Sequence, residues 1–361
     1  MKAKAAVMRE AHAPLTIEEI EVDKPARREV LIRTVFAGVC HSDLHFIEGL
    51  YPIPCPCVLG HESAGVVEAV GEDVTYVKPG DHVITCLSTF CGECEFCLTG
   101  RMTLCESPMV QRAKDSKQRL SQNGEVVGQF ANLSSYAEYI LTHEHSVVKI
   151  REDMPLDVAA LIGCGVMTGV GAVFHTAKVA PGSTVAVFGC GGIGLSAING
   201  AKIAGAGQII AVDMVGSKLN LAKEFGATDV VNPADGDAVK QIRALTGGGV
   251  EYSFEAVGLK LTAEQSFRAL RRGGTATIIG MVPVGTNIEL HGPDFLREKK
   301  IQGSSMGSNH FRVDMPRLVE FYLRGDLKLD QMISGRIKLE EINDAMAQLK
   351  TGEVARNVIA F

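Results

Sequence analysis

The chain has 361 residues, of which 46% are hydrophobic and 22% are charged, and its formal net charge is −6 at pH 7. This composition is that of a globular protein of about two domains, and it excludes disordered and fibrous classes. Because the chain has no basic excess and no tryptophan, we expect no nucleic-acid partner. We find neither an apolar run of about 20 residues nor the apolar centre of a signal peptide, so we expect a cytoplasmic protein without membrane attachment.

The first half of the chain is predicted to be rich in β-strands. After an amino-terminal strand, valine- and isoleucine-rich runs that close on glycine or turn residues are predicted as strands at 30–40, 63–71 and 81–87. The segment 106–129 is polar and charged, which predicts a surface excursion or a lid, and the alternative is a solvated loop.

After Pro155, apolar runs alternate with helical patterns. Strands buried on both faces are predicted at 184–189, 208–213, 250–258 and 275–280, and helices at 193–206 and 215–227. This alternation is typical of βαβ units and a parallel sheet. The tail is predicted to hold an amphipathic helix at 315–325 and a last strand at 357–361.

A glycine-rich turn follows the strand 184–189. It fits the G-x-G-x-x-G pattern with Gly189, Gly191, Gly192, Ile193 and Gly194. Glycines let the backbone approach a pyrophosphate at a helix amino terminus. Asp213 ends the next strand, where its carboxylate can bind both ribose hydroxyls and repel a 2′-phosphate. The pattern therefore predicts an NAD site, and the alternative is a glycine-rich turn without a ligand.

Four of the ten cysteines lie in one short loop, as Cys91, Cys94, Cys97 and Cys105. Cytosolic thiols stay reduced, so such a cluster points to a metal more than to disulfides. Four thiolates complete a tetrahedral zinc ion and leave no open position, which predicts a structural zinc site. The alternatives are an iron–sulfur cluster and four unliganded thiols.

A second set of metal-ligating residues is dispersed. Cys40 lies in GVCHSDLH, His61 in GHES and Cys164 in LIGCGVMTG. Two thiolates and one imidazole leave the fourth position of zinc open, as in a catalytic site. The alternative is that the three side chains are packed core residues.

Taken in chain order, these motifs resemble the zinc-dependent medium-chain alcohol dehydrogenases. The segments that carry the resemblance are GVCHSDLH, GHESAGVVEAVG, the four-cysteine loop, GCGVMTG, FGCGGIG and Asp213. The resemblance covers essentially the whole chain and is closest to the long form with two zinc ions per subunit. It implies an α/β plus β fold with the active site in a cleft: a GroES-like catalytic domain at 1–165 and 306–361, with the structural loop at 91–105, interrupted by a Rossmann NAD-binding domain with a doubly wound parallel sheet at 166–305.

The resemblance also implies roles at the metal. Cys40, His61 and Cys164 would bind the catalytic zinc ion. Glu62 corresponds to a carboxylate that approaches the metal during exchange of water or product. Asp43 would orient His61, as imidazoles bound to zinc usually require.

For catalysis, the resemblance implies that Ser42 hydrogen-bonds the alcohol and that His45 is the terminal base of a proton relay. The coenzyme residues that it implies are His41, Thr168, Lys218 and Arg356. His41 stands where many family members carry an arginine against the pyrophosphate, and histidine is only partly charged near neutral pH. The substrate-pocket residues that it implies are Tyr51, Leu87, Phe130 and Met281.

The implied activity is hydride transfer between a primary alcohol, whether aliphatic, allylic or aromatic, and NAD. The alternatives are a dehydrogenase of S-(hydroxymethyl)thiols, a nicotinoprotein that keeps NAD bound, and a non-catalytic NAD sensor. The partners that we expect are a small alcohol or aldehyde and a second copy of the chain in a homodimer, with a tetramer as the alternative.

Overall fold

The computed structural model describes residues 1–351 and 355–361. The chain divides into two compact units. Unit 1 comprises Met1–Cys164, His310–Gly325 and Leu329–Phe361, and unit 2 comprises Gly165–Asn309 and Asp326–Lys328. The chain leaves unit 1 after Cys164 and leaves the long segment of unit 2 after Asn309. These positions lie one and four residues from the domain limits expected at 165 and 305. The expected α/β plus β class is confirmed, because unit 1 is rich in β-strands and unit 2 holds an all-parallel sheet.

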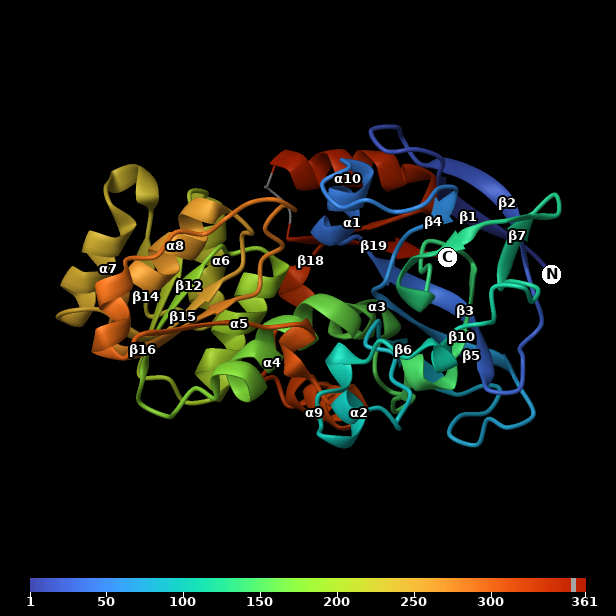
Figure 1. Cartoon of the computed structure of the whole chain (residues 1–361), viewed down its shortest axis with the longest axis horizontal. Helices are drawn as coiled ribbons and strands as arrows, with labels where there is room; N and C mark the ends of the chain where they lie inside the picture. The colour runs from blue at the N-terminus through green and yellow to red at the C-terminus, as the bar shows by residue number, and fades with distance from the viewer. Residues whose placement is uncertain (352–354) are drawn as a thin grey trace. The chain divides into compact units, whose positions relative to one another are not determined.

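Two sheets form the framework of unit 1 (Figure 1). The first has the order β8-β7-β2-β1-β4-β9, with β1 Lys2–Met8, β2 Thr16–Val22, β4 Cys57–Val58, β7 Leu120–Gln122, β8 Glu125–Val126 and β9 Gly128–Gln129. The second has the order β11-β6-β5-β3-β19-β18, and β10 also pairs with β3. Its strands are β3 Glu29–Gly38, β5 Ser63–Val70, β6 His82–Thr85, β10 Tyr139–His143, β11 Val147–Lys149, β18 Ile333–Ile337 and β19 Arg356–Ala360. The strands predicted at 30–40, 63–71, 81–87 and 357–361 are confirmed as β3, β5, β6 and β19.

The segment 106–129 contains three short strands, β7, β8 and β9. Within it, β7 pairs antiparallel with β2, and β9 pairs parallel with β4. The prediction missed these strands because they are only two or three residues long and their residues are mostly polar.

The helices of unit 1 are α1 His41–Ile47, α2 Glu95–Leu98, α3 Leu156–Leu161, α9 Phe311–Leu323 and α10 Ile342–Thr351. The tail helix predicted at 315–325 is α9, which begins four residues earlier. The sequence interpretation missed α10, although Ile342, Ala345, Met346 and Leu349 show the i, i+3, i+4, i+7 spacing of a helix with one apolar face. These four side chains are buried in the core beside β1 and β4.

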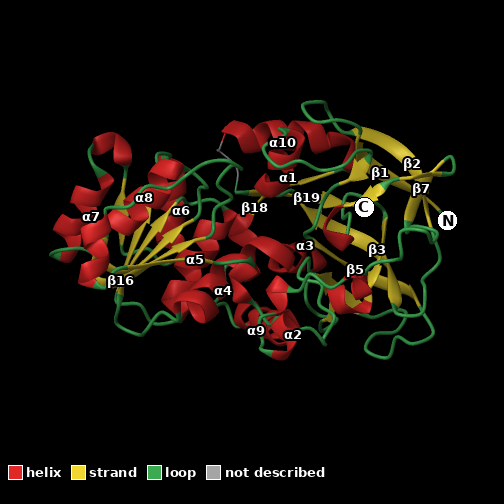
Figure 2. Cartoon of the chain, in the orientation of Figure 1, coloured by secondary structure: helices red, strands yellow, loops and turns green. Residues whose placement is uncertain are grey.

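The parallel sheet of unit 2 has the order β14-β13-β12-β15-β16-β17, and Figure 2 shows helices on both of its sides. Its strands are β12 Thr184–Phe188, β13 Gln208–Val212, β14 Asp229–Val231, β15 Val250–Glu255, β16 Leu270–Ile278 and β17 Lys300–Gly303, and its helices include α5 Gly192–Ile203, α6 Gly216–Phe225, α7 Ala238–Thr246 and α8 Lys260–Arg268. The four predicted strands and two predicted helices are confirmed, while β14, β17, α7 and α8 were missed. The strand order reverses between β12 and β15, and doubly wound folds bind ligands at such a point.

One helical segment is long and apolar enough to pass as a membrane span. It runs from Leu156 to Ala177 and combines α3, a π-helical turn at Ile162–Val166, α4 Met167–Gly171 and a second π-helical stretch at Ala172–Ala177. We expected no apolar run of about 20 residues, and the length and composition of this helical segment show that this expectation is wrong. However, 89% of its most apolar window is buried inside the protein, as in a core helix.

Candidate active site

Cys40, His61 and Cys164 converge inside unit 1. One ligand atom of each lies within 4.8 Å of the other two, and all three residues are buried. Cys40 precedes α1, where β3 has ended, and Cys164 lies in the π-helical turn Ile162–Val166, a distortion that is frequent at functional sites. Three donors around one point leave a fourth position open, which is the arrangement of a catalytic zinc site.

Ser42 places a hydroxyl group at this donor set. Its Oγ lies 3.0 Å from Cys40 Sγ and 3.1 Å from His61 Nε2. Cys40 carries a lowered pKa, because the Cys164 thiol hydrogen-bonds it and because Arg356 and His61 lie nearby. A thiolate is the form that binds a metal.

His45 follows Ser42 by three residues on α1, so both side chains lie on one face of the helix. Its Nδ1 is buried and has no hydrogen-bond partner among residues 1–351 and 355–361. Partial burial lowers the pKa of His45, which favours the neutral, proton-accepting imidazole. The His41 ring lies 5.2 Å from the His45 ring.

Asp43 contacts the ring nitrogen of His61 that faces away from the metal-ligand cluster. Its Oδ1 lies 3.2 Å from His61 Nδ1 and accepts the Gly60 N–H at 3.0 Å. The Tyr136 hydroxyl donates to Oδ2 at 2.8 Å. The sequence analysis missed Tyr136, and no sequence signal could have found it, because it lies 93 positions from Asp43.

Glu62 is fully buried next to an arginine. Arg356 Nε lies 3.5 Å from Glu62 Oε1, and Arg356 Nη2 lies 3.5 Å from Cys40 Sγ. Burial raises the pKa of Glu62 to about 7 against the opposing charge of Arg356. Arg356 therefore neutralises charge at the metal ligands, and its expected contact with the pyrophosphate stays a prediction.

Aromatic rings flank His61. The Phe130 ring meets the His61 ring edge to face at 5.6 Å between centroids, and Phe46 packs against Phe130 at 4.7 Å. Tyr51 lies 5.9 Å from Phe46. Two of the predicted pocket residues, Tyr51 and Phe130, thus belong to one aromatic cluster near the metal ligands, and Phe46 was missed.

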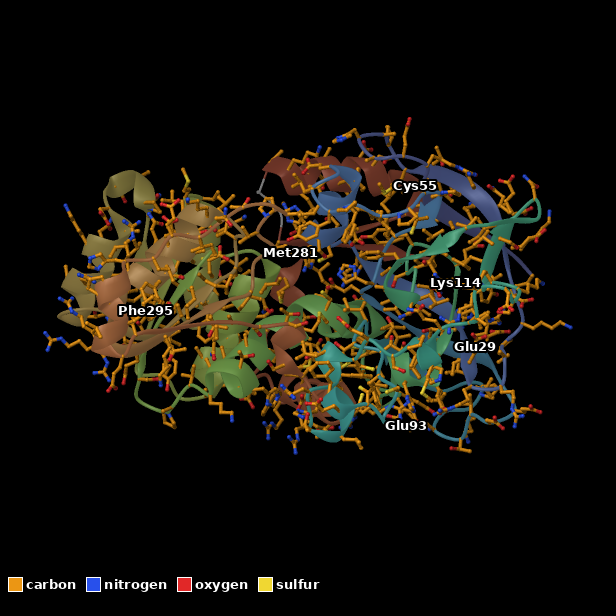
Figure 3. The ribbon with its side chains drawn as sticks, in the orientation of Figure 1. Glu29, Cys55, Glu93, Lys114, Met281 and Phe295 are labelled. Atoms are coloured by element: carbon orange, nitrogen blue, oxygen red, sulfur yellow. The ribbon has the colours of Figure 1, made fainter. Side chains whose placement is uncertain are left out.

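The other two predicted pocket residues are Leu87 and Met281. Leu87 packs against the core cluster of unit 1 that includes Val83 and Ile140. Met281, labelled in Figure 3, belongs to unit 2. A Cβ on Gly258 would lie 2.7 Å from the carbonyl oxygen of Met281.

The four-cysteine loop brings its sulfur atoms together. The Sγ atoms of Cys91 and Cys97 are 3.8 Å apart, those of Cys94 and Cys97 are 3.5 Å apart, and those of Cys94 and Cys105 are 3.8 Å apart. Zn–S bonds of about 2.3 Å in tetrahedral geometry put sulfurs about 3.8 Å apart. The backbone N–H of Glu93 lowers the pKa of Cys91 to about 6, with help from the N–H of Cys94. The loop therefore fits a closed, structural zinc site.

The glycine-rich turn of unit 2 has the geometry of a dinucleotide loop. Gly189 has φ of +93°, which favours glycine, and a Cβ on Gly194 would lie 1.8 Å from the Gly189 carbonyl oxygen. Gly191 caps α5, whose first residues are Gly192 and Ile193. A Cβ on Gly191 would meet no atom within 4 Å, so the helix amino terminus has open space beside it.

Asp213 directly follows β13 beside this turn. Its carboxylate accepts the N–H of Cys190 at 2.8 Å and that of Val215 at 2.9 Å. Lys218, on α6, lies close enough for its charge to act on Cys190. Thr168, also in unit 2, donates its hydroxyl to the Met306 sulfur at 3.3 Å. Asp213 and Lys218 thus lie at the turn, and their binding of a nucleotide ribose stays a prediction.

Known protein families match the sequence of both units. The family model for an alcohol dehydrogenase GroES-like domain matches residues 26–152, and that for a zinc-binding dehydrogenase matches residues 192–324. The chain is 42% identical to an alcohol dehydrogenase class-3 of Pisum sativum over 366 residues, which cover 99% of this chain and 97% of that protein. It is 40% identical to an S-(hydroxymethyl)glutathione dehydrogenase of Saccharomyces cerevisiae over 371 residues, covering 99% of this chain and 96% of that protein.

Among solved structures, the benzyl alcohol dehydrogenase of Acinetobacter calcoaceticus matches with a TM-score of 0.95 at 34% identity, covering 100% of this chain and 99% of that chain. Overall fold, metal ligands and sequence identity therefore lead to one family. The chain belongs to the zinc-dependent medium-chain alcohol dehydrogenases, as an NAD-dependent enzyme with a structural zinc site in the four-cysteine loop and a catalytic zinc site at Cys40, His61 and Cys164.

Proposed function

We propose that this enzyme oxidises primary alcohols with apolar substituents, above all aromatic and allylic ones, to aldehydes. Zinc held by Cys40, His61 and Cys164 would supply the Lewis acidity that lowers the pKa of an alcohol hydroxyl, and NAD bound at the glycine-rich turn would supply the hydride acceptor. The observation that carries the proposal is the position of Ser42, whose Oγ is within hydrogen-bond distance of both Cys40 Sγ and His61 Nε2.

Ser42 and His45 move the proton in this proposal. Ser42 Oγ would accept the proton of the substrate hydroxyl as it gives up its own proton. The His45 imidazole, one helical turn later on α1, would be the terminal base of this relay and would release a proton to solvent. A buried Nδ1 without a partner in the described part of the chain supports a role in binding a ligand or a proton. The lowered pKa of His45 keeps the ring neutral and able to accept.

The aromatic cluster determines the preferred alcohols. Phe130 and Phe46 pack edge to face beside His61, and neither ring carries a charge. Such a wall favours the edge or face of an aryl or allyl group over a polar chain. Tyr51, Leu87 and Met281 are further wall residues in this proposal.

The coenzyme contacts in this proposal are centred on the glycine-rich turn of unit 2. Asp213 would bind the adenosine ribose beside Lys218, and the turn from Gly189 to Gly194 would hold the pyrophosphate. His41 and Arg356 would face the pyrophosphate, and Thr168 the nicotinamide. Glu62 would approach the metal when ligands exchange, which its raised pKa supports because the carboxyl changes charge near neutral pH.

The test is a panel of alcohols and aldehydes with NAD, followed by the absorbance of reduced nicotinamide, with zinc and bound NAD measured on the same preparation. We expect two zinc ions per subunit and higher kcat/KM for benzyl or cinnamyl alcohol than for ethanol. Turnover that needs an added electron acceptor other than NAD, with NAD copurified, would instead show a nicotinoprotein. Bound NAD without turnover of any panel member would show a non-catalytic sensor.

A second candidate is the oxidation of S-(hydroxymethyl)glutathione. The name of the Saccharomyces cerevisiae relative favours it, whereas the uncharged aromatic rings near His61 do not favour the glutathione carboxylates. Formaldehyde with and without glutathione decides between them. A kcat/KM for the glutathione adduct far above that for benzyl alcohol would support this second candidate.

We also propose a cytoplasmic homodimer, with a tetramer as the alternative. In unit 2, β17 is the last strand of the sheet, and an edge strand is a natural place for pairing with a second copy. Light scattering after size-exclusion chromatography measures the mass, and a monomer at micromolar concentration would contradict the proposal.

A further inference from the structure

The segment 106–129, hereafter the excursion, is anchored by a buried carboxylate. Glu29, at the start of β3, accepts hydrogen bonds from Arg112 Nη2 at 2.6 Å and from Arg119 Nε at 2.7 Å. Glu29 is 4% exposed and Arg119 is 6% exposed. Figure 3 labels Glu29 and, within the excursion, Lys114. A buried carboxylate paired with two guanidinium groups keeps this geometry, because separating the charges would leave a buried charge unpaired.

The same network reaches the end of the excursion. Arg119 Nη1 donates to Gln129 Oε1 at 3.0 Å. The amide nitrogen of Gln129 donates to the carbonyl oxygens of Leu141 at 2.8 Å and Leu133 at 3.3 Å. The side-chain amide of Gln129 therefore connects Arg119, which its oxygen contacts, with the turn that follows, where its nitrogen contacts Leu133.

That turn, residues 130–134, has an unusual backbone. Ala131, Asn132 and Ser134 have φ values of +52°, +60° and +61°, which residues other than glycine rarely adopt. The Phe130 N–H donates to Ser134 Oγ at 3.0 Å, and that hydroxyl donates to the Val58 carbonyl oxygen at 2.7 Å. Such a conformation persists only where surrounding hydrogen bonds hold it.

The turn sets the position of Phe130. Its ring meets His61 at 5.6 Å and Phe46 at 4.7 Å between centroids. An unbroken series of hydrogen bonds therefore runs from Glu29 through Arg119 and Gln129 to the turn that presents an aromatic ring to a metal ligand.

We propose that Gln129 and Arg119 are positioning residues for Phe130, and that through them the excursion determines which alcohols the enzyme prefers. The proposal rests on the proposed function, since it takes Phe130 as part of the substrate-pocket wall. It gives the excursion a role in specificity and none in chemistry, so zinc content and turnover of a small alcohol do not depend on Gln129.

The test compares Gln129→Leu with Gln118→Leu in the full-length enzyme. Gln118 is a matched control, because its amide also donates to two carbonyl oxygens, those of Ala113 and Ser116, within the excursion. In Gln129→Leu we expect the kcat/KM ratio of benzyl alcohol to ethanol to fall about tenfold, through KM. Gln118→Leu should leave the ratio within about twofold of the wild type. An unchanged ratio in folded, zinc-loaded Gln129→Leu would overturn the proposal.

Two further measurements separate positioning from general stability. In a Phe130→Ala background, Gln129→Leu should change the ratio no further, because the two residues act through one ring; an equal further fall would contradict the mechanism. Amide hydrogen exchange of the 128–134 segment should speed up in Gln129→Leu and not in Gln118→Leu. If Gln129→Leu does not fold, Gln129→Glu keeps the acceptor for Arg119 but removes both donated bonds, and the same shifts are expected.

Hydrogen exchange also distinguishes a failure of the proposed function from a failure of the positioning role of Gln129. A wild type that turns over no alcohol refutes the proposed function, while faster exchange in the variant would still support the positioning of the turn. A wild type that prefers benzyl alcohol, with an unchanged ratio and unchanged exchange in Gln129→Leu, refutes the positioning alone.

Discussion

The hydroxyl of Tyr136 lies 2.8 Å from Oδ2 of Asp43, and both side chains are completely buried. The other oxygen of the carboxylate faces His61 and the N–H of Gly60. Asp43 thus has a donor on each oxygen, which holds it in one orientation. Groups behind a metal ligand fix its tautomer and direction. Tyr136 therefore contributes to the metal site through Asp43, and its hydroxyl also accepts the backbone N–H of Cys40 at 3.4 Å.

Removing this hydroxyl should weaken zinc binding at the catalytic site. Tyr136→Phe leaves a buried carboxylate oxygen without its donor, which costs about 1–3 kcal/mol of stability, and it frees Asp43 to rotate. We expect the catalytic zinc to leave about 10- to 100-fold faster in a chelator. Tyr139→Phe, three residues further on in β10, is the control. Equal release rates in both variants would exclude this role.

Ser42→Ala should lower kcat by about 10²- to 10⁴-fold, because proton transfer loses its first acceptor. Zinc content and NAD binding should stay unchanged, since neither depends on this hydroxyl. Ser42→Thr keeps a hydroxyl at the same place and should recover most of the activity. Steady-state kinetics with zinc analysis checks both variants, and a fully active Ser42→Ala enzyme would contradict the proton path.

The four-cysteine loop should hold one zinc ion that matters for stability and not for turnover. Cys97→Ser removes one of four ligands, so we expect zinc to fall from two ions to one per subunit and the melting temperature to drop. Cys55→Ser, at an exposed free cysteine, is the control. Metal analysis and thermal unfolding measure the outcome; two zinc ions in Cys97→Ser would refute the assignment.

Asp213 should determine coenzyme choice. Asp213→Asn removes the charge that repels a 2′-phosphate but keeps one oxygen for a backbone N–H of the turn. We expect the NADP to NAD ratio of kcat/KM to rise about tenfold or more. Asp235→Asn makes the same change in net charge on the loop after β14 and should leave the ratio unaltered. The prediction fails if both variants behave alike.

Stability should fall in mild acid because of His143. Burial, with the nearby His145 and Arg28, lowers the pKa of His143 to about 3 from 6.5. Below pH 6.5 the unfolded chain therefore binds a proton that the folded chain does not, so stability is complete above pH 6.5 and is lost as the pH falls toward 3. At pH 5 the loss from this group is about 2 kcal/mol.

His143→Asn tests this effect. The amide oxygen of asparagine can still accept the His145 N–H, as His143 Nδ1 does at 3.1 Å, but it does not titrate. Urea unfolding at pH 7 and pH 5 should show a smaller loss of stability in the variant than in the wild type. The same pH dependence in both proteins would rule out His143 as the cause.

Local patterns determined much of this protein without any tertiary information. The four cysteines of the structural site lie within 15 residues, and the glycine turn with its flanking strand and helix is a single βα unit. Short spacings of this kind constrain geometry by themselves, because few backbone paths connect the residues. The alternation of apolar runs in the second half likewise predicted the parallel sheet, since buried strands have no polar face.

Several contacts around the catalytic site were decided by the tertiary structure alone. Tyr136 meets Asp43 across 93 positions, and Arg356 meets Cys40 across 316. The packing of Phe46 on Phe130 and the bond from Arg119 to Gln129 also depend on which strands pair in unit 1. A side chain's own sequence context carries no record of such partners, because long-range contacts follow from the joint packing of whole elements and not from local spacing.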